Sequence, residues 1–255
     1  VGACAALALR NDGHEVPLID RDEPGNGCSF GNAGFIQSAT PHPMATPNIL
    51  KNLPALLFDP QSPLSIKWRH VPHLAPWLLQ FFRASSSRRV EEISIAMMAL
   101  LERSGAAYDR ILRDAKSTDL IRRRGLLFVY PDDDAFEAAR WEFDLYRRRG
   151  AQVERIGRDQ LRQMEPALNP DYADAYFLPE TFFTIDPLLL TGRIVERFIE
   201  VGGHFVRAEV REIEIGADGL RALHTSIGQI AVSNLVIAAG IHSLQFAARL
   251  GDRVL

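Results

Sequence analysis

The spacing of apolar residues along the chain predicts an alternation of helices and strands. The longest helical pattern covers residues 88–115, where apolar side chains recur at steps of three and four residues. Another helix is predicted to begin at Asp186-Pro187, an N-cap acid followed by proline in the first turn, and to end at Gly202-Gly203. The remaining helical patterns cover residues 1–10, 132–149, 158–164 and a segment from Ser243.

Short apolar runs between these helices predict strands. The first covers residues 14–20 and ends in Asp20, although Pro17 removes one hydrogen-bond donor from it. The others are expected at residues 126–130, 172–178, 205–215, 220–226, 229–232 and 234–239. Residues 40–76 contain many prolines and no sustained period, which predicts irregular structure. This order of elements predicts an α/β fold in more than one part.

Composition narrows the function classes. The chain has 255 residues, is 47% apolar and 24% charged, and carries a net charge of -3, which is the composition of a soluble globular protein. The near-neutral balance gives no electrostatic reason to expect a nucleic-acid partner. Two cysteines, Cys4 and Cys28, form neither a disulfide framework nor a zinc-binding pattern, so we expect no metal site and a reduced, cytoplasmic setting.

The first candidate motif is a dinucleotide-binding turn that lacks its opening. Gly2 precedes an alanine-rich helix and matches the third glycine of such a turn, which permits close packing of helix on strand. Asp20 follows at the end of the next strand, where an acid accepts hydrogen bonds from a ribose. The first strand and the first two glycines are absent, and a nicotinamide-dependent dehydrogenase is also compatible with this pattern taken alone.

Two further small-residue segments favour a flavin over a nicotinamide. A nicotinamide-binding half would continue into another helix and strand, but a glycine-rich connection at residues 28–34 follows Asp20 instead. Ala238-Ala239-Gly240 then closes the last predicted strand. With Gly2 and the strand end at residues 18–21, these segments resemble the D-amino-acid oxidase/dehydrogenase superfamily of FAD-dependent flavoproteins, in particular its bacterial D-amino-acid dehydrogenase branch. The resemblance extends over nearly the whole chain.

The resemblance implies a fold in which two domains share one chain. A glutathione-reductase-like, Rossmann-type FAD-binding domain would be discontinuous, built from residues 1–45 and 185–255. Residues 46–184 would form an inserted α+β substrate domain. Since the first two glycines and a C-terminal continuation of the family are missing, we expect the chain to be incomplete at both ends and its flavin site to be incomplete as well.

The resemblance also assigns residues to the FAD site. Asp20 would bind the ribose hydroxyls, with Arg21 beside the adenosine. The segment from Ser29 to Ile36 would line the pyrophosphate and isoalloxazine, largely through backbone N–H groups. Val210 would meet the adenine, or would be an ordinary core residue. The full set is Gly2, Asp20, Arg21, Ser29, Asn32, Ala33, Gly34, Ile36, Val210, Ala238, Ala239 and Gly240.

Substrate contacts and catalytic residues are less well defined by the sequence. His42 follows the flavin loop and is a substrate candidate, although a surface or internally hydrogen-bonded histidine is the more common outcome. Tyr176 and Phe183 either line the substrate cavity or fill the core. No acid/base pair stands out, so no catalytic side chain is assigned.

An apolar, basic segment offers a different kind of contact. Its aromatic and aliphatic residues are interleaved with Lys67, Arg69 and Arg83, a composition that suits a membrane interface. Packing beneath the substrate domain is the alternative that we favour from sequence. The apolar members are Trp68, Trp77, Leu78, Leu79, Phe81 and Phe82.

The function implied by the resemblance is oxidation of an amino acid, either a D-amino acid or a proline-like imino acid. Hydride transfer to flavin N5 would give an imine, and the electrons would pass to a quinone of the respiratory chain or to another acceptor. The protein would be cytoplasmic, with peripheral contact at the inner face of the membrane. The alternatives are a non-catalytic fragment that binds no flavin and an NAD-dependent dehydrogenase.

Overall fold

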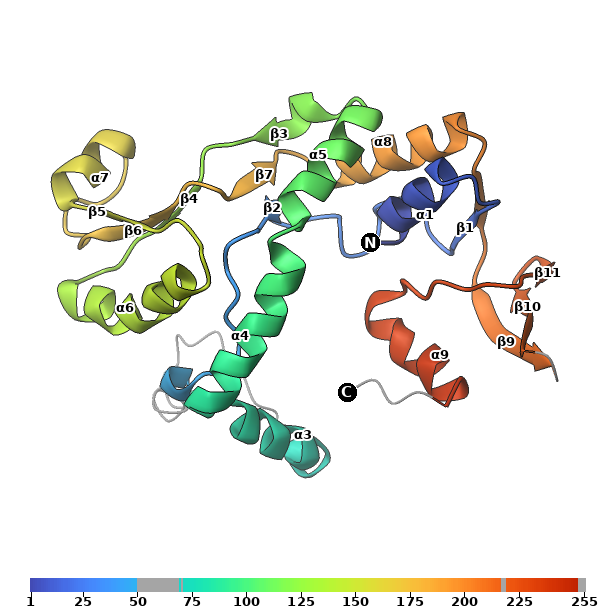
Figure 1. Ribbon diagram of the computed structural model, residues 1–255, viewed down its shortest axis with the longest axis horizontal. Coiled ribbons are helices and arrows are strands. Elements are labelled where there is room, and N and C mark those ends of the chain that lie inside the picture. Colours follow the sequence, from blue (N-terminus) through green and yellow to red (C-terminus); the bar gives the residue numbers. More distant parts are fainter. Residues whose placement is uncertain (50–68, 70, 217–218, 252–255) are drawn as a thin grey trace. The chain divides into compact units, whose positions relative to one another are not determined.

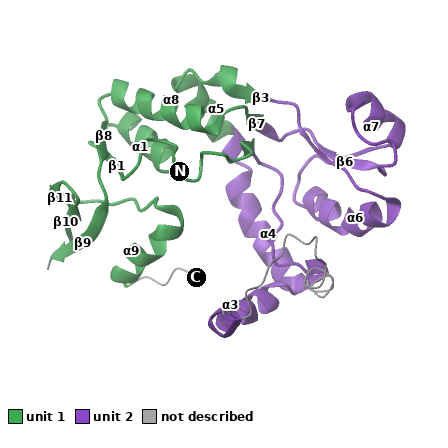
Figure 2. Cartoon of the chain, turned by 180° about the vertical axis from the view of Figure 1, so that it is seen from behind, with its two compact units in different colours: residues 1–35, 106–122, 183–255 green, residues 36–105, 123–182 purple. Residues whose placement is uncertain are grey.

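A computed structural model describes residues 1–49, 69, 71–216 and 219–251 of the chain (Figure 1). The chain divides into two compact units (Figure 2). Unit 1 consists of residues 1–35, 106–122 and 183–255, and unit 2 of residues 36–105 and 123–182. Both units combine helices with strands, which confirms the predicted α/β class.

Unit 1 is built around one pair of parallel strands and two packed helices. Strand β1 (Pro17–Asp20) pairs in parallel with β8 (His204–Arg207), so that Asp20 lies opposite Arg207. Pro17 is the first residue of β1, a position where a missing donor is tolerated. Helix α1 (Gly2–Asn11) packs along α8 (Pro187–Glu200).

Helix α8 follows directly from the sequence signals at its two ends. The Asp186 side chain accepts a hydrogen bond from the Leu189 N–H at 2.9 Å, and Pro187 begins the helix. Gly202 stops it with a φ of +87°, a conformation that glycine adopts without strain. Its buried stripe consists of Leu190, Ile194, Val195 and Phe198.

The C-terminal part of unit 1 is an antiparallel sheet in the order β11-β10-β9. Its apolar cluster has Ile213, Leu223 and Phe246 at its centre. Phe246 comes from α9 (Ser243–Arg249), which follows the short 3-10 helix η3 (Gly240–His242). The three strands are β9 (Val210–Gly216), β10 (Gly219–Thr225) and β11 (Gly228–Ala231).

Three more elements complete unit 1. Helix α5 (Ser104–Asp114) leads through the 3-10 helix η2 (Thr118–Leu120) into β3 (Ile121–Arg122). Strand β3 pairs antiparallel with residues 183–184 of β7 (Phe182–Thr184). Boundaries between the units fall inside β2 (Phe35–Ile36), after the first two residues of α5, after β3 and inside β7.

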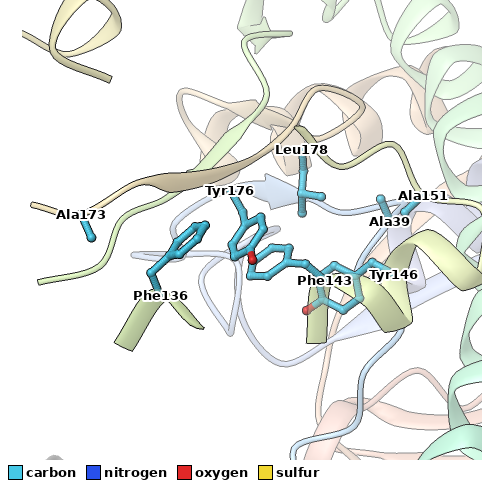
Figure 3. Packing of buried hydrophobic residues seen from close by; sticks show 8 residues of the cluster. All are labelled: Ala39, Phe136, Phe143, Tyr146, Ala151, Ala173, Tyr176 and Leu178. Carbon is cyan, nitrogen blue, oxygen red and sulfur yellow. The ribbon is translucent and has the colours of Figure 1, made fainter. Parts of the chain in front are cut away.

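Unit 2 has an aromatic core between a helix and a sheet. Helix α6 (Asp133–Arg148) contributes Phe136, Phe143 and Tyr146, which pack with Tyr176 of β6 (Figure 3). The sheet order is β4-β6-β5, with β4 (Leu126–Phe128), β5 (Glu154–Ile156) and β6 (Ala175–Leu178), and both pairings are antiparallel. The other helices are α3 (Val71–Ala84), α4 (Ser87–Leu101) and α7 (Arg158–Met164).

Four expectations from the sequence are wrong in detail. The helix predicted at 88–115 is two helices, because the Ser104 hydroxyl donates to the Leu101 carbonyl at 2.7 Å and competes with the helical pattern at that turn. The strand predicted at 205–215 is interrupted after Arg207, where the chain leaves β1 and joins β10. Residues 71–76 are helical rather than irregular.

The fourth error is the strand predicted at residues 234–239. This segment has no regular structure, because within the described chain no strand runs alongside it to pair with its backbone groups. The apolar Ile237 instead packs against the sheet of β9, β10 and β11. Trp68 and Lys67, which the sequence analysis considered, lie outside the described residues.

Candidate functional site

The carboxyl end of the parallel strand pair exposes a carboxylate. Asp20 is the last residue of β1, and its backbone carbonyl accepts a hydrogen bond from the Ala208 N–H at 2.8 Å. One carboxylate oxygen of Asp20 accepts from the Asp22 N–H at 3.1 Å, and the side chain remains exposed. An exposed acid held at the carboxyl end of a parallel strand is well placed to accept hydrogen bonds from ribose hydroxyls.

The start of α1 at Gly2 lies against two other predicted cofactor segments, the strand that ends in Asp20 and the segment at 238–240. A Cβ atom at Gly2 would lie 3.4 Å from the Ala238 Cβ and 3.8 Å from Leu18 Cδ1. The start of α1, the strand before Asp20 and the segment at 238–240 therefore meet in unit 1, although residues 2 and 238 stand at opposite ends of the chain. A side chain larger than hydrogen at position 2 would be in contact with both neighbours.

Val210 belongs to the apolar cluster beneath these segments. It is half-buried, and it packs against the cluster of Ile213, Leu223 and Phe246. Ile19 and Ile237, the neighbours of Asp20 and Ala238, pack against the same cluster. The cluster thus fixes the positions of three predicted cofactor segments, and an adenine contact of Val210 stays a prediction.

The glycine-rich loop is held by its own backbone and side-chain hydrogen bonds. The Asn32 side-chain oxygen accepts from the Gly34 N–H at 2.8 Å, and the Ser29 carbonyl accepts from the Asn32 N–H at 3.3 Å. Gly31 has a φ of +70° and no atom within 4 Å of the position its Cβ would take, so open space lies beside the loop. Asn32 and Ala33 are exposed, as a backbone surface for a phosphate requires.

Arg207 is a neighbour of this site that sequence reasoning missed. It lies opposite Asp20 in the register of β1 and β8, and its guanidinium contacts Glu23 at 2.8 Å. Arg21 is exposed and makes an ion pair with Asp22 at 3.3 Å. Arg207 is far from Asp20 in the sequence, and only the parallel pairing of β1 with β8 places them together.

The arrangement in unit 1 fits the adenosine and pyrophosphate of FAD. It offers an exposed carboxylate for a ribose, a helix start without acidic residues in its first turn, and an exposed loop beside open space. The partial positive charge at a helix N-terminus favours phosphate oxygens. Ala238, Ala239 and Gly240 are also exposed, which leaves their backbone groups accessible.

Tyr176, one of the three substrate candidates, lies in the aromatic core of unit 2. It is 3% exposed, and its ring stacks on Phe143 at 4.0 Å and on Phe136 at 4.6 Å between centroids (Figure 3). Burial raises the pKa of the Tyr176 hydroxyl. This packing supports the core alternative for Tyr176, the second of the two interpretations that the sequence allowed.

The other two candidates have defined partners as well. In unit 2, the His42 Nδ1 atom is hydrogen-bonded to the Tyr146 hydroxyl and lies 3.5 Å from a Glu142 carboxylate oxygen. The Tyr146 hydroxyl also donates to Glu142. Burial, together with the Glu142 carboxylate, raises the pKa of Tyr146. In unit 1, the Phe183 ring packs against Phe35 at 5.9 Å between centroids.

Neither metal sites nor membrane-spanning helices are found in the part of the chain that the structure describes. No group of three or more His, Cys, Asp or Glu side chains there is arranged to hold a metal ion. Among the same residues, no helix combines the length and the apolarity needed to cross a bilayer. Ile36, the last of the predicted cofactor residues, is buried in unit 2.

Comparisons with known proteins show the family to which the chain is related. The model of the family described as "DAO: FAD dependent oxidoreductase" matches residues 1–255. A D-amino-acid oxidase from Bradyrhizobium diazoefficiens is 32% identical over 99% of this chain and 60% of the relative. A D-amino acid dehydrogenase 2 from Ralstonia nicotianae is 31% identical over 95% of this chain and 59% of the relative. The chain thus spans about 60% of the length of these curated relatives.

Solved structures show the same fold at lower sequence identity. An L-proline dehydrogenase from P. horikoshii superposes with a TM-score of 0.69 and 16% identity, covering 100% of this chain and 54% of that one. A glycine oxidase from Bacillus cereus gives a TM-score of 0.65 and 17% identity, covering 98% and 55%. At this level of identity the likeness concerns the fold alone.

Proposed function

Because the chain belongs to the DAO family of FAD-dependent oxidoreductases, we propose that the whole protein oxidises an amino acid with FAD as its cofactor. The substrate class is a D-amino acid or a proline-like imino acid. The observation that carries the proposal is the meeting of Gly2, Leu18 and Ala238 beside the exposed Asp20 carboxylate. Relatives named D-amino-acid oxidase and D-amino acid dehydrogenase support the choice of substrate.

In this proposal most of the residues that hold the cofactor belong to unit 1. Asp20 accepts hydrogen bonds from the adenosine ribose, and Arg21 lies beside the adenosine. The start of α1 at Gly2 and the segment 238–240 present backbone N–H groups to the pyrophosphate. Ser29, Asn32, Ala33, Gly34 and Ile36 line the pyrophosphate and isoalloxazine, and Val210 supports the adenine.

The chemistry requires little acid or base from the side chains. Bound FAD supplies a hydride acceptor at N5 for the hydrogen on the α-carbon of the substrate. The protein orients the amino acid and excludes water, and no side-chain base is needed when the amine arrives neutral. For a primary amino acid, water then converts the imine product to a 2-oxo acid and ammonia, whereas a proline-like imino acid gives a cyclic imine and releases no ammonia. His42 and Phe183 are proposed substrate contacts, and Tyr176 contributes through the core in which it is buried.

The electron acceptor is a quinone or another acceptor of the respiratory chain. A quinone is lipid-soluble, so this part of the proposal includes peripheral contact with the inner face of a membrane.

The test is the visible absorption spectrum of the purified whole protein under anaerobic conditions. We expect flavin bands that bleach on addition of D-amino acids or of proline, and an unchanged spectrum with NAD. A colourless protein that takes up no added FAD would favour a non-catalytic role. Reduction of added NAD by the substrate would favour the nicotinamide-dependent alternative.

A further inference from the structure

His42 is held against helix α6 by the residues that precede it. Ala39 is fully buried and Thr40 is nearly so, which anchors this part of the chain in unit 2. The His42 ring lies 5.5 Å from the Tyr146 ring between centroids. The His42 side chain is 34% exposed, whereas Tyr146 is fully buried in the aromatic core (Figure 3). His42 is therefore the member of this pair that a ligand can reach.

Glu142 is the third member of this cluster. It stands four positions before Tyr146 on α6, so the two side chains lie on the same face of the helix. One Glu142 carboxylate oxygen accepts from the Tyr146 hydroxyl and lies 3.5 Å from His42 Nδ1. Among the described residues, Glu142 and Tyr146 are the titratable groups in contact with His42. Burial and the Glu142 carboxylate raise the pKa of Tyr130, which follows β4.

The hydrogen bonds of Tyr146 determine which nitrogen of His42 carries the proton. A tyrosine hydroxyl has one hydrogen, and Tyr146 donates it to Glu142, since an ionised carboxylate only accepts. The hydrogen bond of 2.5 Å between the Tyr146 oxygen and His42 must then be donated by an Nδ1–H group. Because the pKa of Tyr146 is raised, its hydroxyl keeps its hydrogen at neutral pH. The Nε2 atom of neutral His42 is left with a free lone pair and, within the described chain, without a hydrogen-bond partner.

We propose that His42 Nε2 accepts a proton from the ammonium group of the substrate, and that Tyr146 and Glu142 are positioning residues for His42. The inference rests on the proposed function, in which His42 contacts the substrate. An amino acid carries an ammonium group at neutral pH, whereas the proposed oxidation requires a neutral amine. One N–H bond of the ammonium breaks, the substrate nitrogen keeps the electron pair, and the proton forms a bond with Nε2.

The cluster favours this transfer through both ring nitrogens. The hydrogen bond from Nδ1–H to Tyr146 fixes the tautomer whose lone pair is on Nε2, as the third member of a catalytic triad does for its histidine. Once Nε2 has taken the proton, the ring is positively charged, and the Glu142 carboxylate at 3.5 Å stabilises that charge. The imidazolium later returns its proton to water, which reaches the exposed part of the ring.

The tautomer of His42 can be measured without cofactor or substrate. Nitrogen-15 NMR of the whole protein distinguishes Nδ1–H from Nε2–H imidazole, and the His42 signals are those missing from His42→Gln. We expect the Nδ1–H form in the unsubstituted protein and a mixture of tautomers in Tyr146→Phe. The control Tyr172→Phe removes a hydroxyl beside a different apolar cluster of unit 2 and should keep the Nδ1–H form. An Nε2–H form in the unsubstituted protein would overturn the proposal.

The role of the base is tested by anaerobic reduction of the flavin in the whole protein with D-alanine and with D-proline, from about pH 6 to about pH 10. His42→Gln should slow reduction by about a hundredfold near neutral pH. The difference should close at high pH, where the amine is neutral without help. Tyr146→Phe should slow it by about tenfold or more, with the same convergence. The control His73→Gln changes an exposed histidine of α3 and should follow the unsubstituted protein at every pH.

Two readouts separate loss of the base from loss of structure. Equal FAD content and equal melting temperatures show that a variant is folded. Free imidazole added to His42→Ala should restore part of the rate near neutral pH, because it supplies the missing base. Rates of His42→Gln that are unchanged, or lowered by the same factor at every pH, would overturn the proposal and leave the proposed function in place. Failure of both amino acids to reduce the flavin of the unsubstituted protein would overturn the proposed function, and this proposal with it.

Discussion

Two glycines of the glycine-rich loop at residues 28–34 have similar backbone angles and different neighbours. Gly31 has a φ of +70° and Gly34 a φ of +75°, a region in which a residue with a side chain is strained by about 1–2 kcal/mol. A Cβ at Gly31 would meet nothing within 4 Å, whereas a Cβ at Gly34 would lie 2.4 Å from the Thr184 carbonyl oxygen. Only Gly34 is therefore fixed both by its conformation and by a backbone neighbour.

We predict that Gly34→Ala lowers the free energy of unfolding by about 3 kcal/mol or more, since strain and displacement of a strand add together. Gly31→Ala is the matched control and should cost about 1–2 kcal/mol. Urea denaturation of both variants measures the difference. Equal midpoints would mean that Gly34 is not packed against Thr184 as described.

Single residues also mark the limit of what the sequence predicts. Asp20 was identified as a ribose-type acid, and it does end a parallel strand with its own side chain exposed. Arg207 was not identified, because its position opposite Asp20 depends on a strand pairing between distant segments. The partners of His42 were not predicted either, because its hydrogen bond joins it to Tyr146, which is 104 positions away in the sequence.

At the scale of elements, Asp114 connects three helices of unit 1. Its carboxylate accepts hydrogen bonds from Asn11 Nδ2 of α1 and from Arg197 Nε of α8, each at 2.8 Å. Partial burial raises the pKa of Asp114, but these two hydrogen bonds outweigh that effect and leave the pKa below its usual value. The depressed pKa means that the ionised carboxylate stabilises the folded state.

The sign of the pH dependence follows from this depressed pKa. The contribution of Asp114 is fully present above the unfolded pKa of about 3.9 and is lost as the pH falls through the folded value. We predict that Asp114→Asn costs about 1 kcal/mol of unfolding free energy at neutral pH. The difference from the unsubstituted protein should vanish in acid. Urea titrations at several pH values test this, with exposed Asp134→Asn as control; a difference independent of pH would contradict it.

Elements were predicted well where their signals are local. Helix α8 has its cap and its stop in the residues at its own ends, and α7 begins and ends as predicted. The break between α4 and α5 was missed, because the apolar spacing continues through it while a Ser104 hydrogen bond ends the helix. The strand expected at 234–239 failed for a different reason, since a strand exists only where a neighbour pairs with it.

At the scale of the molecule, the amphipathic pattern of a helix shows that one face is buried but not which partner buries it. Residues 106–122 cluster with unit 1, where Asp114 bonds to α1 and α8. The assignment of residues 1–45 and 185–255 to an FAD-binding domain stays a prediction. All the proposed cofactor residues except Ile36 lie in unit 1.

This distribution of residues predicts which backbone amides bound FAD would protect from hydrogen exchange. FAD at a hundredfold excess over its Kd should stabilise the binding-competent state by about 2.7 kcal/mol. Hydrogen exchange of the whole protein should slow at residues 1–6, 18–22 and 29–34. Amides of β5 and α7 in unit 2 provide the control. Uniform slowing of both units, or none at residues 18–22, would contradict the assignment of the site.

The most direct measurement is a titration of the flavin-free whole protein with FAD, followed by flavin fluorescence, for three proteins. Asp20→Asn removes the charge that is proposed to bind the ribose, and Asp22→Asn removes an exposed charge two residues away. We predict that Asp20→Asn weakens the Kd by about ten- to a hundredfold, whereas Asp22→Asn stays within about twofold of the unsubstituted protein. Equal affinities for all three proteins, or no binding by the unsubstituted one, would contradict an FAD site at the end of β1.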